Sequence, residues 1–345
     1  MESKQRILLV FLCCALGWLS ACQNEEVGPQ SNIGESDDIF AYDDGVLIGN
    51  EGTFTFGNAS VDYYQPENGV HASGVFDQVN GLPLGDVLQS MYLDDRDLYL
   101  VVNNSARIAV VNPSTMRLRR DFGALGSPRY VRRYGERLFV SQLFDGKLWV
   151  LDANTGEVLN KWDTPGWTER MELVDSMLWV EDQVGGTLLG FNLERDTLQF
   201  QTDLPGGISD LIEAEGRLYA FAHAAVGSDL VEINPISGEI MRSSDFGAMD
   251  ASFLNYNTDE DAFYFWAGGE IRKFRRADWV LQPASLYETG NANVGGFALD
   301  PGTGDWYYTD VLDFATRGWL YRLDPFFAPL DTIRTGFIPR IILRP

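Results

Sequence analysis

Short apolar runs recur along the chain at an interval of forty residues. Four of them begin at Leu98, Leu138, Leu178 and Leu218, so the same interval occurs three times in succession. Each run is followed by a polar or glycine-containing turn and by a second apolar run, which usually ends at Asp or Asn. Short β-rich units at this period are typical of a β-propeller, whose blades are four-stranded sheets around a central channel.

Three further copies of the apolar run bring the number of units to seven. They are Val46–Gly49, Phe263–Trp266 and Trp306–Thr309, at wider or less regular spacing. Every copy except the first has a weaker apolar run ahead of it, separated by a polar turn, as a β-hairpin requires. We therefore expect each later unit to contain an inner strand followed by a strong second strand.

The C-terminus supplies the element that the first unit lacks. Ile338–Leu343 matches Ser127–Val131 in pattern, and no apolar run precedes Val46 in the acidic segment before it. The sequence thus predicts an all-β fold, a seven-bladed β-propeller whose ring is closed by the C-terminal strand beside Val46–Asn50, without a free edge. A six-bladed ring is the alternative if the irregular first unit is an insertion.

The first residues have the features of a secretory leader. Lys4 and Arg6 form a short basic region, and Ile7–Leu16 is apolar but too short to span a bilayer. Leu19–Cys22 resembles a bacterial lipobox, which implies cleavage before Cys22 and lipidation of that cysteine. The alternative is an ordinary secretory signal with a coincidental cysteine.

Cysteine usage fits the lipoprotein interpretation. Of the three cysteines, Cys13 and Cys14 lie in the leader, so Cys22 would be alone in the mature chain and without a disulfide partner. The polar, acidic stretch that follows is predicted to be a flexible tether. The expected organisation is a signal peptide at 1–21, a tether lipidated at Cys22 at 22–39, and a propeller at 40–345.

Acidic residues directly after the cysteine resemble the export signal of surface lipoproteins in the Bacteroidetes. This resemblance implies an outer-membrane protein that faces the cell exterior, with the periplasmic face as the alternative. The chain carries 26 basic and 50 acidic residues, a formal net charge of −24. Such a charge repels nucleic acid and anionic headgroups, so we expect no nucleic-acid partner and membrane contact only through the lipid.

The sequence gives little support for an enzyme. The two histidines, His71 and His223, are far apart and have no neighbouring His or Cys, so we expect no metal site built on histidine. No nucleophile elbow or phosphate-binding loop is present, and we predict no catalytic residue and no cofactor. Acidic turns such as Asp94–Asp97 could bind calcium weakly, but the solvated-turn interpretation is favoured.

Candidate binding residues lie at one mouth of the channel. In a propeller, the loop before each inner strand and the loop between the second and third strands open on the same face. Three arginines stand one or two residues into inner strands, and together they would suit a carboxylate, phosphate or amide-rich ligand. The alternative is that each pairs with a neighbouring carboxylate and ties two blades together. The predicted ligand-binding residues are Arg129, Arg170, Arg340, Glu169, Asp210, Asp86, Trp167 and Phe144.

Several segments resemble the YncE-like propeller lipoproteins of the Bacteroidetes, a group that includes BtuG-like cobalamin-binding proteins. The segments are Asn50–Gly52, Gly57–Val61, Asn80–Met91, Val102–Ser105 and Ser127–Tyr130. The resemblance implies a propeller that sits on a TonB-dependent outer-membrane transporter and captures a nutrient. The later blades depart from the pattern, for instance at His223–Val226 and Phe314–Arg317.

Three functions therefore remain open at this point. The leading hypothesis is a non-catalytic surface lipoprotein that captures a nutrient, such as cobalamin or another corrinoid, for a TonB-dependent transporter. The second is a protein-interaction scaffold at the outer membrane that uses the same face for a partner chain. The third is a quinoprotein-type propeller enzyme, since propellers carry unrelated chemistries.

Overall fold

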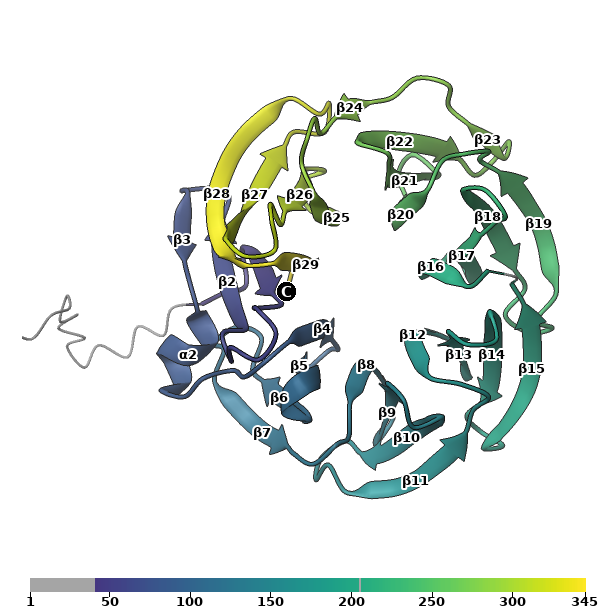
Figure 1. The fold of residues 1–345 in the computed structure, drawn as a ribbon, viewed down its shortest axis with the longest axis horizontal. Coiled ribbons are helices and arrows are strands. Elements are labelled where there is room, and N and C mark those ends of the chain that lie inside the picture. Colours follow the sequence, from purple (N-terminus) through teal and green to yellow (C-terminus); the bar gives the residue numbers. More distant parts are fainter. Residues whose placement is uncertain (1–40, 205) are drawn as a thin grey trace, which may run out of the picture. The chain divides into compact units, whose positions relative to one another are not determined.

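Seven β-sheets stand around a central axis in the computed structural model, which describes residues 41–204 and 206–345 (Figure 1). The predicted leader at 1–21, the lipidation site Cys22 and the tether at 22–39 lie outside the described residues. The predicted seven-bladed β-propeller is confirmed, and the six-bladed alternative is excluded.

Each blade is an antiparallel sheet that runs from an inner strand at the axis to an outer strand at the rim (Figure 1). Blade 1 contains β29 (Pro339–Leu343), β1 (Val46–Asn50), β2 (Ser60–Gln65) and β3 (Val70–Ala72). Blade 2 contains β4 (Leu88–Leu93), β5 (Leu98–Val102), β6 (Arg107–Val111) and β7 (Leu118–Phe122). Blade 3 contains β8 (Pro128–Tyr134), β9 (Arg137–Gln142), β10 (Lys147–Asp152) and β11 (Val158–Asp163).

The remaining blades repeat this order. Blade 4 contains β12 (Thr168–Val174), β13 (Met177–Asp182), β14 (Thr187–Asn192) and β15 (Thr197–Asp203). Blade 5 contains β16 (Ile208–Ala214), β17 (Arg217–His223), β18 (Ser228–Ile233) and β19 (Ile240–Asp245). Blade 6 contains β20 (Ala251–Asn257), β21 (Ala262–Ala267), β22 (Glu270–Arg275), β23 (Val280–Leu281) and β24 (Tyr287–Glu288), which also pairs with β22. Blade 7 contains β25 (Val294–Leu299), β26 (Trp306–Asp310), β27 (Arg317–Leu323) and β28 (Pro329–Phe337).

The C-terminal strand closes the ring as the sequence predicts. β29 pairs with β1 in antiparallel register, with Leu47 opposite Leu343 and Gly49 opposite Ile341. Blade 1 therefore combines the last strand of the chain with the first three. This arrangement covers the inner edge of β1, which would otherwise offer unpaired backbone groups.

The hydrophobic core is divided into seven clusters, each between two neighbouring blades. The second strands are buried on both faces, which explains why their sequences are continuously apolar rather than alternating. Large side chains such as Tyr99, Trp179 and Tyr307 are fully buried in these strands and fill the wedge between blades. The regular period of the sequence thus reflects one aromatic or apolar wedge per blade.

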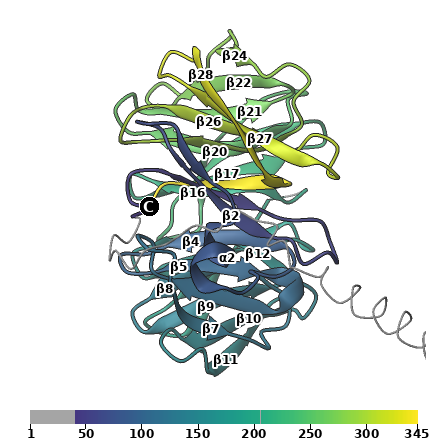
Figure 2. The ribbon, with the colours of Figure 1, turned by 90° about the vertical axis from the view of Figure 1, so that its left-hand side faces the viewer.

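Within residues 41–204 and 206–345, one short α-helix and one 3₁₀ turn, η1 (Asn103–Ser105), interrupt the strands, and neither was predicted. α2 (Val75–Asn80) lies beside β2, next to blade 1, where the outer strand β3 has only three residues (Figure 2). Val75 and Phe76 of this helix are buried, and Asn80 bonds the backbone of Met116 and Leu118 in blade 2. No helix among the described residues is long and apolar enough to cross a membrane.

Candidate binding face

The two ends of the channel carry different kinds of connection. In blade 2, Leu88 at the start of the inner strand lies opposite Val102 at the end of the second strand. The loop before each inner strand and the loop after each second strand therefore share one end, which we call the loop face. The opposite end, where the first and second strands are joined by turns such as Asp94–Asp97, is called the hairpin face.

The predicted arginines all lie at a β-bulge near the start of an inner strand. The register shifts between Pro128 and Val131 in β8, between Thr168 and Met171 in β12, and between Pro339 and Ile341 in β29. Bulges leave an extra residue outside the ladder and re-aim its side chain. Arg129 of blade 3 is thus equivalent to Glu169 of blade 4, whereas Arg170 lies one residue further along, at the position of Tyr130. In β29, Arg340 is the single extra residue of the bulge.

Arg129 joins three successive inner strands. Its Nε lies 2.8 and 2.9 Å from the two carboxylate oxygens of Glu169 on β12. Its Nη1 donates a hydrogen bond of 2.5 Å to the side-chain oxygen of Gln89 on β4. Glu169 is buried, so Arg129 neutralises a charge that would otherwise be desolvated without a partner. Arg129 therefore ties blades 2, 3 and 4 together.

Arg170 has looser contacts. Its Nη1 is 3.7 Å from Oε2 of Glu181, its Nε is 3.7 Å from Oδ1 of Asp210, and its guanidinium lies 5.9 Å from the ring centre of Tyr130. Among the described residues, this guanidinium donates no hydrogen bond, because both carboxylates lie beyond hydrogen-bonding distance. Asp210 instead accepts the backbone N–H of Leu254 on β20 at 2.7 Å. Arg170 is thus the predicted arginine with the most spare donor capacity.

The charged cluster around Arg170 shifts the pKa values of its members. Burial raises the pKa of Glu181 to about 7, and the nearby Arg170 guanidinium opposes that rise. Burial likewise raises the pKa of Asp210, against the opposing effect of Arg170. Burial alone would lower the pKa of Arg170, but the neighbouring Tyr130, Asp210 and Glu181 raise it above its ordinary value. Arg170 therefore stays charged, while Glu181 titrates near neutral pH.

Two further predicted residues lie elsewhere on the loop face. Arg340 forms an ion pair of 2.6 Å with Glu51 and lies 5.9 Å from the ring centre of Phe314. Asp86 accepts hydrogen bonds from the backbone N–H of Thr55 and from the side chain of Asn104, so it braces two loops. All three predicted arginines thus have carboxylate neighbours. The structure brings Arg129, Glu169, Arg170 and Asp210 together in the channel and gives Arg340 and Asp86 other contacts.

The predicted aromatic pair is also found at the mouth. Phe144 and Trp167 meet edge to face, with ring centres 5.8 Å apart. The indole Nε1 of Trp167 is buried and has no hydrogen-bond partner among the described residues. A buried indole N–H is usually paired, so this donor is one that a ligand could satisfy only after a movement of the side chains that cover it.

Several exposed apolar side chains stand on the loop face, although others such as Ile236 and Phe326 stand on the hairpin face, and sequence reasoning identified only part of the loop-face set as a binding feature. Phe56 is 73% and Phe144 is 74% exposed, although large apolar residues of this kind are usually buried. Residues of this type stand in the loops between the second and third strands of five blades. We call this set the apolar tips: Phe54, Phe56, Phe144, Val184, Val226 and Phe314.

Two of the apolar tips have strained backbones. Phe144 has φ 77° and Phe314 has φ 60°, in the left-handed region that residues with a side chain rarely adopt. Strain of this kind costs on the order of 1 kcal/mol or more, and it concentrates at functional sites. In both loops an aromatic ring remains at a position where glycine or asparagine would fit more easily. The left-handed backbone could not be read from the sequence.

The acidic turn that could have bound calcium has other contacts. The carboxylate of Asp94 accepts two backbone N–H groups, and Asp97 pairs with Arg119 and Arg120. No group of three His, Cys, Asp or Glu residues that could hold a metal ion is found within residues 41–204 and 206–345.

The fold and this face define a β-propeller with a candidate binding surface at one end of its channel. The chain belongs to the family described as a domain of unknown function, DUF5074, whose model matches residues 44–316. No curated protein matches the sequence significantly.

Solved structures with the same fold are distant in sequence. A quinonprotein alcohol dehydrogenase-like protein from Bacteroides thetaiotaomicron is 13% identical, with a TM-score of 0.71 over 88% of this chain and 78% of that one. Hydrazine synthase from Kuenenia stuttgartiensis is 13% identical, with a TM-score of 0.60 over 72% of this chain and 86% of that one. BamB from Moraxella catarrhalis is 11% identical, with a TM-score of 0.52 over 84% and 85%. At these identities the likeness shows the fold alone.

Proposed function

We propose that this protein is a non-catalytic binding protein that captures a ligand on its loop face. The observation that carries the proposal is the set of apolar tips, which keeps large apolar side chains in solvent around one end of the channel. Exposed apolar surface of this kind marks interaction sites in soluble domains. The strained backbones of Phe144 and Phe314 support the same conclusion, because their cost to stability needs a compensating role.

The polar groups inside the mouth suit a large ligand with both apolar and polar parts. Arg170 has unused guanidinium donors, and Trp167 has an unused indole N–H. A corrinoid has a broad, partly apolar ring surrounded by amide groups, which matches this combination of donors and aromatic tips. We therefore propose a nutrient ligand, with cobalamin or another corrinoid as the first candidate, for delivery to a TonB-dependent transporter.

Calorimetry with cobalamin and other corrinoids tests the ligand, using two substitutions and a matched control. Phe144→Ser and Phe314→Ser each remove an apolar tip, whereas Phe326→Ser removes an aromatic that is 89% exposed in the β27–β28 turn of the hairpin face. We expect roughly a tenfold loss of affinity from each tip substitution and no change from Phe326→Ser. Absence of heat with every corrinoid, or equal losses in all three variants, would reject the nutrient proposal.

The setting of the protein is part of the same proposal. The lipobox-like segment ending at Cys22 supports an outer-membrane lipoprotein, and the acidic residues after it support display on the cell exterior. Cys22→Ala should release the chain to the soluble fraction or leave it with its leader. Unchanged membrane partitioning of this variant would rule out the lipid anchor, and protease treatment of whole cells distinguishes external from periplasmic display.

A protein-interaction scaffold is the second candidate function, and one observation favours it. The apolar tips belong to five blades, so they are distributed more widely than a small ligand needs. A purified transporter from the same locus should then bind the empty protein, with loss of binding in Phe144→Ser and Phe314→Ser. A propeller enzyme is the third candidate. Its only support is the fold that this chain shares with the quinonprotein alcohol dehydrogenase-like protein and with hydrazine synthase.

A further inference from the structure

A cavity on the hairpin face lies outside the site described above. Its volume is about 510 Å³, and it lies between the first hairpins of blades 2 and 3. Its lining includes Tyr92, Asp94, Asp95, Arg96 and Arg133. The volume falls within the range of small-molecule sites.

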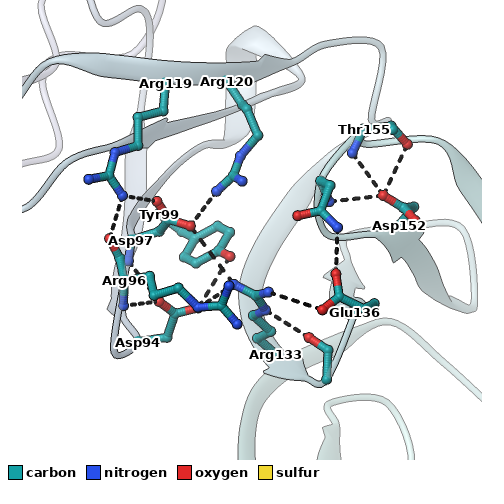
Figure 3. A network of polar contacts seen from close by, with 12 residues as sticks. Asp94, Arg96, Asp97, Tyr99, Arg119, Arg120, Arg133, Glu136, Asp152 and Thr155 are labelled. Atoms are coloured by element: carbon teal, nitrogen blue, oxygen red, sulfur yellow. Dashed lines mark hydrogen bonds and ion pairs between the residues drawn. The ribbon is translucent and has the colours of Figure 1, made fainter.

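The Asp94 carboxylate beside the cavity has no acceptor oxygen to spare. Oδ1 of Asp94 accepts the backbone N–H groups of Arg96 and Asp97, at 2.8 and 2.7 Å. Oδ2 of Asp94 accepts the Tyr99 hydroxyl at 3.3 Å and Nη1 of Arg133 at 3.1 Å (Figure 3). These donors hold the pKa of the Asp94 carboxyl below its ordinary value, against the opposing effect of burial. Asp94 is thus a saturated anion.

Each oxygen of Asp97 accepts one guanidinium donor. Its Oδ1 accepts Nη1 of Arg119 at 2.7 Å, and its Oδ2 pairs with Nη2 of Arg120 (Figure 3). The four oxygens of the two carboxylates therefore serve guanidinium, hydroxyl and backbone donors from two blades.

One buried nitrogen in each of two guanidinium groups is left without a hydrogen-bond acceptor in the described part of the chain. Among the described residues, Nη2 of Arg133 and Nε of Arg120 are buried and have no hydrogen-bond partner. Nη2 forms a long ion pair with the exposed Glu136, whose Oε1 lies 4.0 Å away and is too far for a hydrogen bond (Figure 3). The Arg133 side chain is only 7% exposed, and it lines the cavity. Buried donors of this kind are normally paired, so the cavity lacks an acceptor.

We propose that this cavity binds a small molecule through a carboxylate or phosphate group, which supplies the missing acceptor oxygens. Nη2 of Arg133 donates to the oxyanion from the cavity wall. Arg96 is exposed, and its side chain makes no hydrogen bond or ion pair among the described residues, so its guanidinium is free to take a second oxygen. The ring of Tyr92 offers an apolar surface to the remainder of the molecule.

The charges of the lining are compatible with an anion. Asp94 and Asp95 balance Arg96 and Arg133 in number, in a chain whose net charge is −24. Asp95 is exposed, so water and salt screen its repulsion, whereas the buried Arg133 is screened much less. Because Arg133 already pairs with Asp94, the attraction for an oxyanion comes from its unpaired Nη2 and from Arg96, whose guanidinium has no ion pair among the described residues.

Calorimetry of the purified protein with two probes, citrate and inorganic phosphate, tests this proposal and separates carboxylate from phosphate. We expect at least one probe to bind with a Kd of about 1 mM or tighter. Arg96→Ala should weaken that binding about tenfold, since one charge-assisted contact is lost. Arg195→Ala is the matched control, because Arg195 is exposed in the β14–β15 turn, has the same charge, and does not line this cavity.

A second substitution addresses the buried donor itself. Arg133→Met should abolish binding; if it fails to fold, the comparison of Arg96→Ala with Arg195→Ala decides alone. The proposal is overturned if neither probe binds the native protein, or if the two alanine variants lose the same affinity, which indicates general charge attraction. Since the site is on the hairpin face, Phe144→Ser should leave the binding of citrate and phosphate unchanged.

Discussion

The ring of the propeller has two unlike halves. In the first half, formed by β4, β8, β12 and β16, neighbouring inner strands are joined by charged side chains. In the second half, formed by β20, β25 and β29, the strands approach through backbone atoms, aromatic rings and the Asn255 amide, and one ion pair, Arg344–Asp300, joins the ends of β29 and β25. The charged contacts of the first half are Arg129–Glu169 at 2.8 Å, Arg132–Glu172 at 2.7 Å and Arg170–Asp210 at 3.7 Å.

Close approach in the second half depends on missing side chains. A Cβ atom on Gly296 would lie 2.5 Å from the carbonyl oxygen of Arg340, and one on Gly295 would lie 2.5 Å from that of Pro339. Beside these strands, the ring of Trp306 stacks between those of Phe297 and Phe327, with centres 5.1 and 5.5 Å away. The first half thus has more ion pairs between its inner strands, and the second half depends more on close packing. The first half should respond to pH and the second to side-chain volume.

Loss of the closing strand should have the largest effect. Deletion of the chain from Gly336 onward removes β29, so β1 loses its inner partner and the backbone contacts of blade 7 with β29 disappear. We expect a loss of more than about 5 kcal/mol, which is comparable with the stability of a typical domain. Thermal unfolding followed by circular dichroism measures it. A truncated protein with an unchanged melting temperature contradicts the closure of the ring by this strand.

A larger side chain in the second half should be the next most damaging change. Gly296→Val places a branched side chain against the backbone of β29, which cannot move without disturbing blade 1. Overpacking of this kind costs about 3 kcal/mol. Gly123→Val is the control, because a Cβ atom there has no neighbour within 4 Å. Equal urea midpoints for the two variants would show that the second half tolerates volume, against our interpretation.

Removal of one arginine tests the first half. Arg129→Met leaves the buried Glu169 without its partner, and breaking a buried pair costs about 3 kcal/mol. Arg340→Met breaks the pair with Glu51, but Arg340 is 49% exposed, so we expect a loss below about 1 kcal/mol. Chemical denaturation of both variants provides the comparison. Similar losses of unfolding free energy in the two variants would mean that burial does not determine the strength of these ion pairs.

A change of pH should affect the first half through Glu181. Burial raises its pKa to about 7 in the folded state, so the folded chain retains a proton that the unfolded chain releases near its ordinary pKa of 4.5. The contribution of this proton to the free energy of unfolding is fully present at pH values below the unfolded pKa. It is lost as the pH rises through the folded pKa of about 7. Between pH 5 and pH 8 we expect the free energy of unfolding of the native protein to fall by roughly 2 kcal/mol more than that of the Glu181→Gln variant. Parallel urea titrations of the two proteins measure this difference, and superimposable pH profiles would refute it.

The sequence predicted the elements that repeat and missed those that occur once. The forty-residue interval carries the buried second strands and also the pairing of Arg129 with Glu169, because equivalent residues of successive blades lie side by side. Closure by the C-terminal strand followed from the same pattern. Helix α2 is six residues long and has too few apolar positions to show a helical period. Nη2 of Arg133 is unpaired because the neighbouring oxygens already accept other hydrogen bonds, and no residue spacing in the sequence predicts that.

Relief of backbone strain should have the smallest effect and should compare the two halves directly. Phe144 stands in blade 3 of the charged half and Phe314 in blade 7 of the other half, with φ 77° and φ 60°. Phe144→Gly and Phe314→Gly permit the left-handed backbone without a Cβ atom, so each should raise stability by about 1 kcal/mol. Each should also weaken ligand binding at the loop face, because an exposed ring is removed. If only one of the two glycine variants loses stability, the phenylalanine ring that it removes packs as part of the fold in that half. The loop face of that half then has no strained aromatic side chain that is retained for binding.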